Sequence, residues 1–242
     1  KLGDGTTTNS SLPKKIGSGF RTAAAGINHS VAVKIDGSLW AWGFTYSSLP
    51  QHIGAGFSAV SAGNDYTVAL KTDGSLWAWG NNNTSGVIGD GTTQPSAVPK
   101  QIGTDFVAAS AGYFHTVAIK TDGSLWAWGY KDGGRTPVTS PMKIGDGFKA
   151  VDAGNLHTIA IANDGSIWTW GVNNSGQLGD GTTFTRSSPA RVPILANASS
   201  ISASNGYSLA IVGGLARAWG LNGNGQLGDA TLASRSTPVL IT

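Results

Sequence analysis

Histidine, aspartate and serine are the side chains in this 242-residue sequence that could act as acids, bases, nucleophiles or metal ligands. Three of the four histidines, His29, His115 and His157, lie in the same local sequence, and Tyr66 and Tyr207 take their place in two further copies. A general base or a metal ligand would not be expected three times with tyrosine as its substitute. We therefore interpret these histidines as structural residues, hydrogen-bonded within their own repeat unit. Because the chain has no cysteine, thiolate metal sites and cysteine nucleophiles are excluded.

The aspartates are explained first by turns. Asp-Gly pairs recur at four equivalent places, Asp36-Gly37, Asp73-Gly74, Asp122-Gly123 and Asp164-Gly165. Because Asp and Gly tolerate the positive φ that a type I′ turn requires, each pair predicts a hairpin. No two carboxyl groups stand out as a general acid and a general base.

Glycine-rich loops occur at residues 176–182 and from Gly225, with a variant from Gly86. A phosphate-binding loop needs a lysine and a following helix, and a calcium site needs about six to eight oxygen ligands, whereas each of these loops has one aspartate. We expect the glycines to form tight turns, with Leu178 or Leu227 anchoring the loop. The sequence therefore predicts no catalytic residue, no metal site and no cofactor.

The three histidines and the Asp-Gly pairs lie within a sequence unit that is repeated along the chain. Its clearest part begins at an Ala-Gly pair, passes through the His or Tyr position and ends at a Trp-Gly pair. It occurs at residues 25–43, 62–80, 111–129 and 153–171, with a degenerate fifth copy at 203–220, and these copies contain all nine tryptophans. The closing glycines are spaced by roughly 35 to 50 residues, which is the size of a propeller blade.

Each copy contains two strands that meet at the Asp-Gly pair. In the third copy, Val117 and Ile119 face one side and smaller residues face the other, so both faces are apolar and each needs a neighbour. A further strand precedes each Ala-Gly pair, as at 57–62, and a proline-marked segment such as 98–102 is expected to be an outer strand. Four antiparallel strands per unit predict an all-β fold, a β-propeller with five visible blades.

Composition and charge exclude several classes of protein. The chain contains 36 glycines, one methionine and no glutamate, which is unlike a mainly helical protein. With 40% hydrophobic and 12% charged residues, it also lacks the composition of a disordered chain. The net charge is only +3, and the 16 lysines and arginines are spread singly along the chain except for Lys14-Lys15. Because they form no basic patch, we expect no nucleic-acid partner. No apolar run is long enough to predict membrane insertion.

The repeated motifs Ala-Gly-x-x-His-Thr and Asp-Gly-Ser-Leu-Trp-Ala-Trp-Gly, together with the loop at 176–182, resemble the regulator of chromosome condensation repeat in a form common among bacterial proteins. The resemblance implies a propeller, typically of seven blades, and leaves the activity open.

We expect one domain over residues 1–242. Residues 1–17 would supply the outer strand of a preceding blade, with the strand itself at 12–16, and blades would follow over 18–53, 54–102, 103–144, 145–194 and 195–242. This extra strand favours a longer array of six or seven blades over a closed five-bladed ring.

The turn between the innermost strand and the next strand varies at a fixed place of the repeat. The two residues after each Ala-Gly pair, or after its degenerate equivalent, are Ile27-Asn28, Asn64-Asp65, Tyr113-Phe114, Asn155-Leu156 and Asn205-Gly206. In a propeller all five turns emerge around the axis at one end, which gives a ring of differing chemistry on a rigid scaffold. Tyr113 and Phe114 favour an aromatic contact anchor, and the alternative is that one ring packs on its neighbour.

The sequence therefore predicts a non-enzymatic scaffold that binds another macromolecule. We expect a protein partner, with a carbohydrate-binding, lectin-like propeller as the alternative, and a secreted or cell-surface bacterial location. The candidate partner-binding residues are Ile27, Asn28, Asn64, Asp65, Tyr113, Phe114, Asn155, Leu156 and Asn205.

The fifth copy departs from the pattern. It is one residue shorter, has Gly213-Gly214 in place of Asp-Gly, and has Arg217 where the first tryptophan of the pair should be. Because a charged group is costly in a dry interface, we expect Arg217 to face solvent, an acidic partner or the gap left by absent blades.

Overall fold

In the computed structural model, residues 1–82, 84–134, 136–193 and 195–241 are described. They form five four-stranded antiparallel sheets and contain no helix, so none of them belongs to a helix that could cross a membrane. The all-β propeller fold is therefore confirmed, and each sheet is one blade made of four consecutive strands.

The strands are numbered in chain order. Blade 1 contains β1 (Phe20–Ala25), β2 (His29–Lys34), β3 (Leu39–Gly43) and β4 (Gln51–Gly54). Blade 2 contains β5 (Phe57–Ala62), β6 (Tyr66–Lys71), β7 (Leu76–Gly80) and β8 (Ser96–Gly103). Blade 3 contains β9 (Phe106–Ala111), β10 (His115–Lys120), β11 (Leu125–Gly129) and β12 (Val138–Gly145). Blade 4 contains β13 (Phe148–Ala153), β14 (His157–Ala162), β15 (Ile167–Gly171) and β16 (Arg186–Arg191). Blade 5 contains β17 (Ala198–Ala203), β18 (Tyr207–Val212), β19 (Leu215–Gly220) and β20 (Arg235–Leu240).

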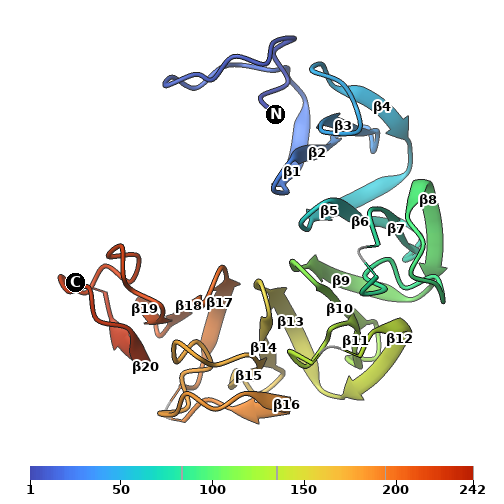
Figure 1. Ribbon diagram of the computed structural model, residues 1–242. Coiled ribbons are helices and arrows are strands. Elements are labelled where there is room, and N and C mark those ends of the chain that lie inside the picture. Colours follow the sequence, from blue (N-terminus) through green and yellow to red (C-terminus); the bar gives the residue numbers. More distant parts are fainter. Residues whose placement is uncertain (83, 135, 194, 242) are drawn as a thin grey trace.

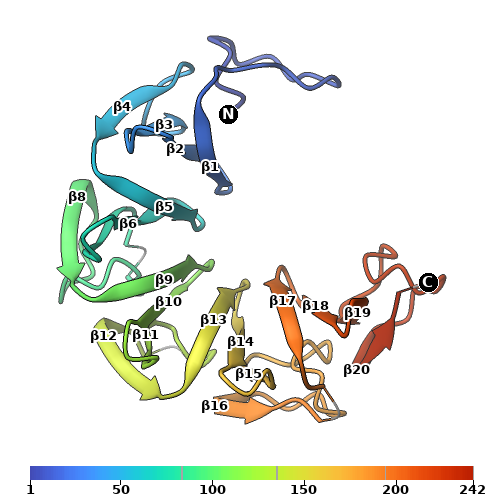
Figure 2. The same cartoon turned by 180° about the vertical axis from the view of Figure 1, so that it is seen from behind.

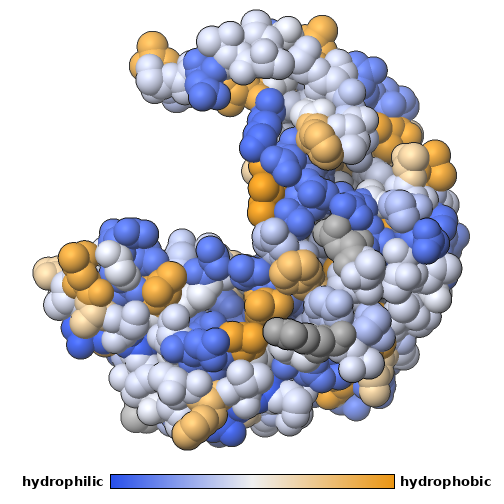
Figure 3. Space-filling model, viewed as in Figure 1, coloured by the Kyte–Doolittle hydropathy of each residue, from blue (hydrophilic) through white to orange (hydrophobic). Residues whose placement is uncertain are grey.

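The blades form an open arc around one axis (Figures 1 and 2). The first strands, β1, β5, β9, β13 and β17, line the inside of the arc, and the fourth strands lie at its outer rim. Neighbouring blades touch through their inner strands, as β10 does with β13. An opening separates blade 1 from blade 5, also visible in Figure 3, so the described residues do not close into a five-bladed ring.

The Asp-Gly pairs close hairpins as predicted, but the predicted turn type is wrong. In blade 3 the backbone N–H of Lys120 donates to the Ser124 carbonyl at 3.0 Å and that of Gly123 donates to the Lys120 carbonyl at 2.9 Å. Only Gly123 has a positive φ, of 77°. This is a three-residue loop, a type I turn followed by a glycine bulge. Asp122 supports it, because its Oδ1 accepts the Ser124 backbone N–H at 2.8 Å.

The shorter fifth copy forms the turn that was predicted for the others. Gly213 and Gly214 both have positive φ, and Val212 pairs directly with Leu215 across a two-residue loop. Two consecutive glycines permit the type I′ geometry without strain, and no aspartate is present to favour the longer loop.

The two tryptophans of each of the first four repeats pack differently. The second tryptophan is deeply buried, and Trp128 is 0% exposed. The first is half-buried: the Trp126 indole N–H donates to Ser124 Oγ at 2.8 Å, and Lys120 Nζ lies 5.0 Å from its ring centroid. The interior between blades therefore depends mainly on the second tryptophan.

The glycine-rich loop of one blade packs on the buried tryptophan of the next. Trp128 Nε1 donates to the Val87 carbonyl at 2.8 Å, and a Cβ on Gly89 would lie 2.6 Å from this indole nitrogen, so only glycine fits. In blade 1, Trp42 Nε1 donates to the Lys1 carbonyl at 2.9 Å. The N-terminal segment thus occupies the place of such a loop against blade 1.

Residues 12–16 do not form the predicted outer strand. An outer strand pairs with the third strand of its own blade, and no such strand for 12–16 exists among the described residues. The segment is instead tied to the N-terminal loop by an ion pair between Lys14 and Asp4, as Lys100 is tied to Asp90 in blade 2.

Candidate binding surface around the axis

The turns after the first strands touch one another around the axis, and we call residues 25–28, 62–65, 111–114, 153–156 and 203–206 the turn ring. A Cβ on Gly63 would lie 2.5 Å from the Gly112 carbonyl oxygen, so a side chain there would force the blades apart. Backbone hydrogen bonds also join successive turns: the N–H of Tyr113 donates to the Gly154 carbonyl at 3.3 Å, and that of Asn155 to the Ser204 carbonyl at 3.2 Å. The turn ring is therefore a rigid frame.

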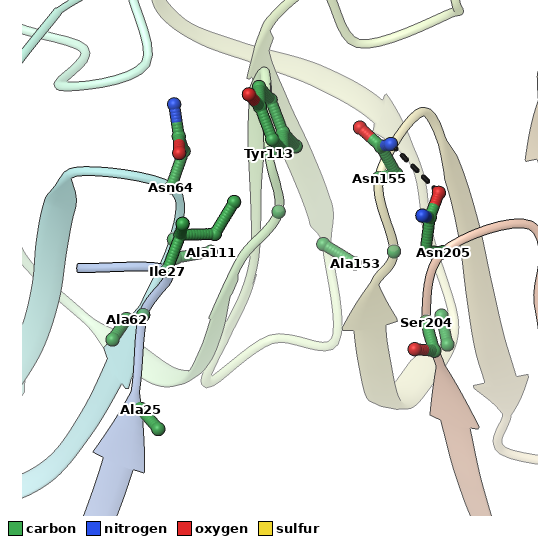
Figure 4. A pocket seen from close by; sticks show the side chains of 15 residues that line it. Ala25, Ile27, Ala62, Asn64, Ala111, Tyr113, Ala153, Asn155, Ser204 and Asn205 are labelled. Atoms are coloured by element: carbon green, nitrogen blue, oxygen red, sulfur yellow. Dashed lines mark hydrogen bonds between the residues drawn. The ribbon is translucent and has the colours of Figure 1, made fainter. Parts of the chain in front are cut away.

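The turn ring surrounds a pocket on the axis, the axial pocket, with a volume of about 350 Å³ (Figure 4). Each blade contributes the residue that follows its Ala-Gly or Ala-Ser pair. Of the predicted binding residues, those that line this pocket are Ile27, Asn64, Tyr113, Asn155 and Asn205. The structure thus brings together five residues that are far apart in the sequence.

The remaining predicted residues do not line the axial pocket. Asn28 Nδ2 donates to Asp65 Oδ1 at 3.1 Å, which links the turns of blades 1 and 2. The Phe114 ring lies 6.0 Å from the Tyr130 ring, and Leu156 is half-buried. The turn ring therefore has an inner set of side chains, which line the pocket, and an outer set, which do not. Some side chains of the outer set make contacts between turns or within a turn.

Tyr113 and Phe114 form an aromatic pair with ring centroids 4.3 Å apart and an interplanar angle of 53°. Both are half-buried. Phe114 packs between Tyr113 and Tyr130, which is the alternative weighed from the sequence, whereas Tyr113 lines the axial pocket. Tyr113 is the aromatic group that a bound molecule would meet there.

Asn155, which lines the axial pocket, contains a buried hydrogen-bond acceptor without a donor. Asn155 Nδ2 donates to Asn205 Oδ1 at 3.0 Å (dashed line in Figure 4), while Asn155 Oδ1 is buried and has no partner among the described residues. An unsatisfied buried acceptor costs about 1–3 kcal/mol. None of the described residues that line this pocket is charged, so its polar groups offer hydrogen bonds rather than ion pairs.

The repeated histidines connect neighbouring blades. His115 Nε2 forms a hydrogen bond of 2.8 Å with Thr158 Oγ1 of blade 4, and the Tyr66 hydroxyl forms one of 2.9 Å with Thr116 Oγ1 of blade 3. The structural interpretation is right, but the partner belongs to the next blade rather than to the same repeat unit.

Burial keeps these imidazoles neutral. It lowers the pKa of His115 to about 4, and it lowers the pKa of His157 to about 3, with a smaller contribution from His115. Neither histidine lines the axial pocket. They therefore hold blades together and offer no general acid or base to a molecule bound there.

Asp152 is a half-buried inter-blade residue that the sequence pattern did not single out. Its Oδ1 accepts the Ser110 hydroxyl at 2.7 Å and its Oδ2 accepts the Ala203 backbone N–H at 2.8 Å, which joins blades 3, 4 and 5. Burial raises the pKa of this carboxyl group. Ser61 makes the related contact two blades earlier, accepting the Ala111 N–H at 3.0 Å. A polar residue directly before the Ala-Gly pair was the available signal.

The aspartates of the glycine-rich loops are engaged within their own loops. Asp229 Oδ1 accepts the Thr231 hydroxyl at 2.8 Å and Oδ2 accepts Arg235 Nε at 2.7 Å. Hydrogen bonds from Thr231 and then from Arg235 lower the pKa of Asp229 to about 2. Across the described part of the chain, no cluster of three or more metal-ligating side chains is found.

Radial four-stranded antiparallel blades around an axial pocket define this molecule as a β-propeller repeat protein. Two models of the regulator of chromosome condensation (RCC1) repeat match it, one at residues 73–119 and 164–211 and the other at 57–86, 106–134 and 148–177. The chain belongs to the RCC1 repeat family. No curated protein sequence matches it.

Several solved structures share the fold. Human WBSCR16 superposes with a TM-score of 0.82 at 19% identity, over 92% of this chain and 67% of that one. Yeast RCC1 (Prp20), solved with Kap60 bound, gives a TM-score of 0.81 at 19% identity, over 91% of this chain and 60% of that one. A second structure of Prp20p from Saccharomyces cerevisiae, described with its binding to Gsp1p and histones, gives 0.81 at 18% identity, over 92% and 63%.

At such identities the likeness shows the fold alone. This chain spans between three fifths and about two thirds of the length of these proteins.

Proposed function

We propose that the protein is a non-enzymatic scaffold that binds another protein through the inner side chains of the turn ring. The observation that supports this most directly is the axial pocket, where one position from each of five repeats converges, with isoleucine in blade 1, tyrosine in blade 3 and asparagine in the other three. Variation at a place whose backbone is fixed by contacts between blades is typical of a recognition surface.

The relatives support a protein partner. Yeast RCC1 (Prp20) has the same fold and binds Kap60, and it is described with binding to Gsp1p and histones. The residues that line the axial pocket of this chain indicate which chemical groups its own partner would present. Tyr113 offers apolar area with a hydroxyl group, and Asn64, Asn155 and Asn205 offer amides, so the proposed partner inserts an uncharged or donor-bearing side chain into the axial pocket.

The test begins with affinity capture from the native source and continues with the purified partner. Replacing Tyr113 with Ala should weaken binding by about 2 kcal/mol or more, because the ring lies at the centre of the proposed contact. The melting temperature should change little, since Tyr113 is only half-buried and points to an open pocket. Isothermal titration calorimetry and thermal unfolding measure the two quantities.

Phe184→Ala is the matched control, because Phe184 is an aromatic residue 76% exposed on the loop before β16, outside the turn ring. It should leave the affinity unchanged. The proposal fails if Tyr113→Ala and Phe184→Ala bind the partner equally well, or if Tyr113→Ala acts only by unfolding the protein.

A carbohydrate ligand is the alternative that the same variants address. A glycan array probed with the purified protein should give no signal that depends on Tyr113. A glycan that binds the unmodified protein and is lost with Tyr113→Ala would replace the protein partner in this proposal. The proposed secreted or cell-surface location is tested by fractionating cells of the native source.

A further inference from the structure

A second cleft lies between blades 4 and 5 and shares no residue with the axial pocket. Its volume is about 370 Å³. Asp180 belongs to the glycine-rich loop of blade 4, Pro193 and Leu195 to the connection between the blades, and Arg217 and Pro238 to blade 5. The cleft thus combines apolar walls with one unusual cation.

Arg217 occupies the place of the first tryptophan in the repeat. It pairs with Ala210 across the β18–β19 hairpin, as Trp126 pairs with Ala118 in blade 3. The side chain lines the cleft against blade 4. It therefore does not face the gap at the open end of the arc, which was one of the three environments expected from the sequence. The replacement of a large indole by a flexible guanidinium accounts for space at this point.

The Arg217 side chain is half-buried, and its Nε is buried with no hydrogen-bond partner among the described residues. Trp126, by contrast, has its indole N–H satisfied by Ser124. A buried donor without an acceptor is unfavourable, and more so when it carries charge. An anionic ligand would compensate the charge of this guanidinium group.

The carboxylate in the cleft does not neutralise Arg217. Asp180 Oδ1 accepts the Thr182 hydroxyl at 2.7 Å, and Oδ2 accepts Arg186 Nε at 2.5 Å. The Asp180 side chain is only 6% exposed, and its ion pair is with Arg186. One carboxylate and two guanidinium groups leave a local excess of positive charge at Arg217.

We propose that this cleft binds a carboxylate group. Arg217 would donate from its two terminal Nη groups to the two oxygens, a paired geometry that a guanidinium and a carboxylate favour, because Nε itself is buried. Pro193, Leu195 and Pro238 would contact a small apolar body next to the carboxylate. The group could belong to a free small acid or to the C-terminus of a protein, and the experiment separates these sources.

The first measurement follows the Arg217 Nε–H signal by NMR in the full chain. The probes are N-acetyl-L-leucine and a hexapeptide ending in leucine with a free carboxylate. Their controls are the corresponding C-terminal amides and sodium sulfate. A carboxylate should shift the signal in a saturable way, and the amides should not. The proposal is overturned if no carboxylate shifts the signal, or if the amides or sulfate shift it equally.

The source follows from which carboxylate binds. Binding of N-acetyl-L-leucine shows that a small acid is sufficient, whereas binding of the peptide alone shows that the carboxylate comes from a protein terminus. Either result supports the cleft as a carboxylate site.

Variants then link binding to the guanidinium. Arg217→Gln should reduce carboxylate affinity by about tenfold or more, because the charge and the paired donors are lost. Arg217→Trp restores the repeat residue, fills the cleft and should abolish binding without lowering the melting temperature. Arg191→Gln removes an exposed arginine of β16 with the same change in net charge and should alter affinity by no more than about twofold.

Retained binding in both Arg217 variants would refute the site. The test is independent of the turn ring, because Tyr113→Ala leaves this cleft intact and should bind the carboxylate probe as the unmodified protein does.

Discussion

In the layer where neighbouring blades touch, the same residue types recur: a histidine or tyrosine bonds to a threonine or serine of the next blade, and a buried tryptophan bonds to an oxygen of the preceding loop. In the turn ring, a few residues away along the chain, the position that lines the axial pocket is isoleucine in blade 1, tyrosine in blade 3 and asparagine in blades 2, 4 and 5. Repetition is needed where a side chain must fit the surface of the next blade. A side chain that faces an open pocket has no such requirement.

This difference separates two kinds of effect. Substitutions in the contact layer should lower stability and leave binding per folded molecule unchanged, whereas substitutions in the turn ring should do the opposite.

Trp128→Ala should destabilise the protein by about 3–5 kcal/mol, because it empties a fully buried site between blades 2 and 3 and removes the bond to Val87. Trp126→Ala should cost less than half as much, since Trp126 is half-buried. Denaturation in urea, followed by tryptophan fluorescence, measures both. If both variants lose the same free energy of unfolding, the buried and the half-buried tryptophan contribute equally to stability, contrary to this prediction.

The buried histidines should make the contact layer sensitive to acid. With the pKa of His115 at about 4 in the folded protein, against about 6.5 when unfolded, the unfolded chain binds a proton that the folded protein excludes. The stabilisation is complete above pH 6.5 and is lost as the pH falls toward 4, by roughly 3 kcal/mol.

His115→Tyr tests this by copying the residue that blade 2 has at the same place, Tyr66. The acid-unfolding midpoint should move to lower pH, as measured by circular dichroism. His52→Gln removes an exposed imidazole on β4 and is the control, for which no such movement is expected. An unchanged midpoint for His115→Tyr would mean that other groups govern acid unfolding.

Gly112→Ala should lower stability by about 1–3 kcal/mol, because its Cβ would lie 2.5 Å from the Gly154 carbonyl oxygen of the next blade. Gly223 is the matched position, with no atom within 4 Å of a Cβ and no positive φ, so Gly223→Ala should be close to neutral. Thermal unfolding of the pair measures the cost of separating two turns. Similar melting temperatures would indicate that the turn ring can expand freely.

The fold was predictable because its signals are local. Asp122-Gly123 marks a hairpin, alternating residues such as Val117 and Ile119 mark a two-sided strand, and the same order recurs in each repeat. The turn type was not predictable from the residue pair alone. It depends on the bond from the Ser124 backbone N–H to the Asp122 carboxylate, which selects a three-residue loop.

The candidate surface was predictable in outline only. Its place follows from topology, since all five turns must emerge around one axis. The separation of Tyr113 from Phe114 depends on Tyr130, which comes from a different loop, and the partner of His115 lies in the next blade. Contacts between distant segments of this kind leave no mark in a local pattern. Arg217 was visible as a departure from the repeat, but the cleft around it required the geometry of blade 4.

The smallest expected effect on stability is that of Asn205→Ala, within the turn ring. Asn205 is exposed, and the change removes one hydrogen bond of 3.0 Å from Asn155 Nδ2, whose amide can then bond to water. We expect a loss of about 0.5 kcal/mol or less in urea denaturation, because an exposed hydrogen bond exchanges readily for one with solvent. Partner affinity should fall by more than this, since Asn155 is no longer held in place beside the pocket. A stability loss as large as that of Gly112→Ala would place Asn205 with the contact layer and remove the distinction between repeated and varied positions on which the proposed function rests.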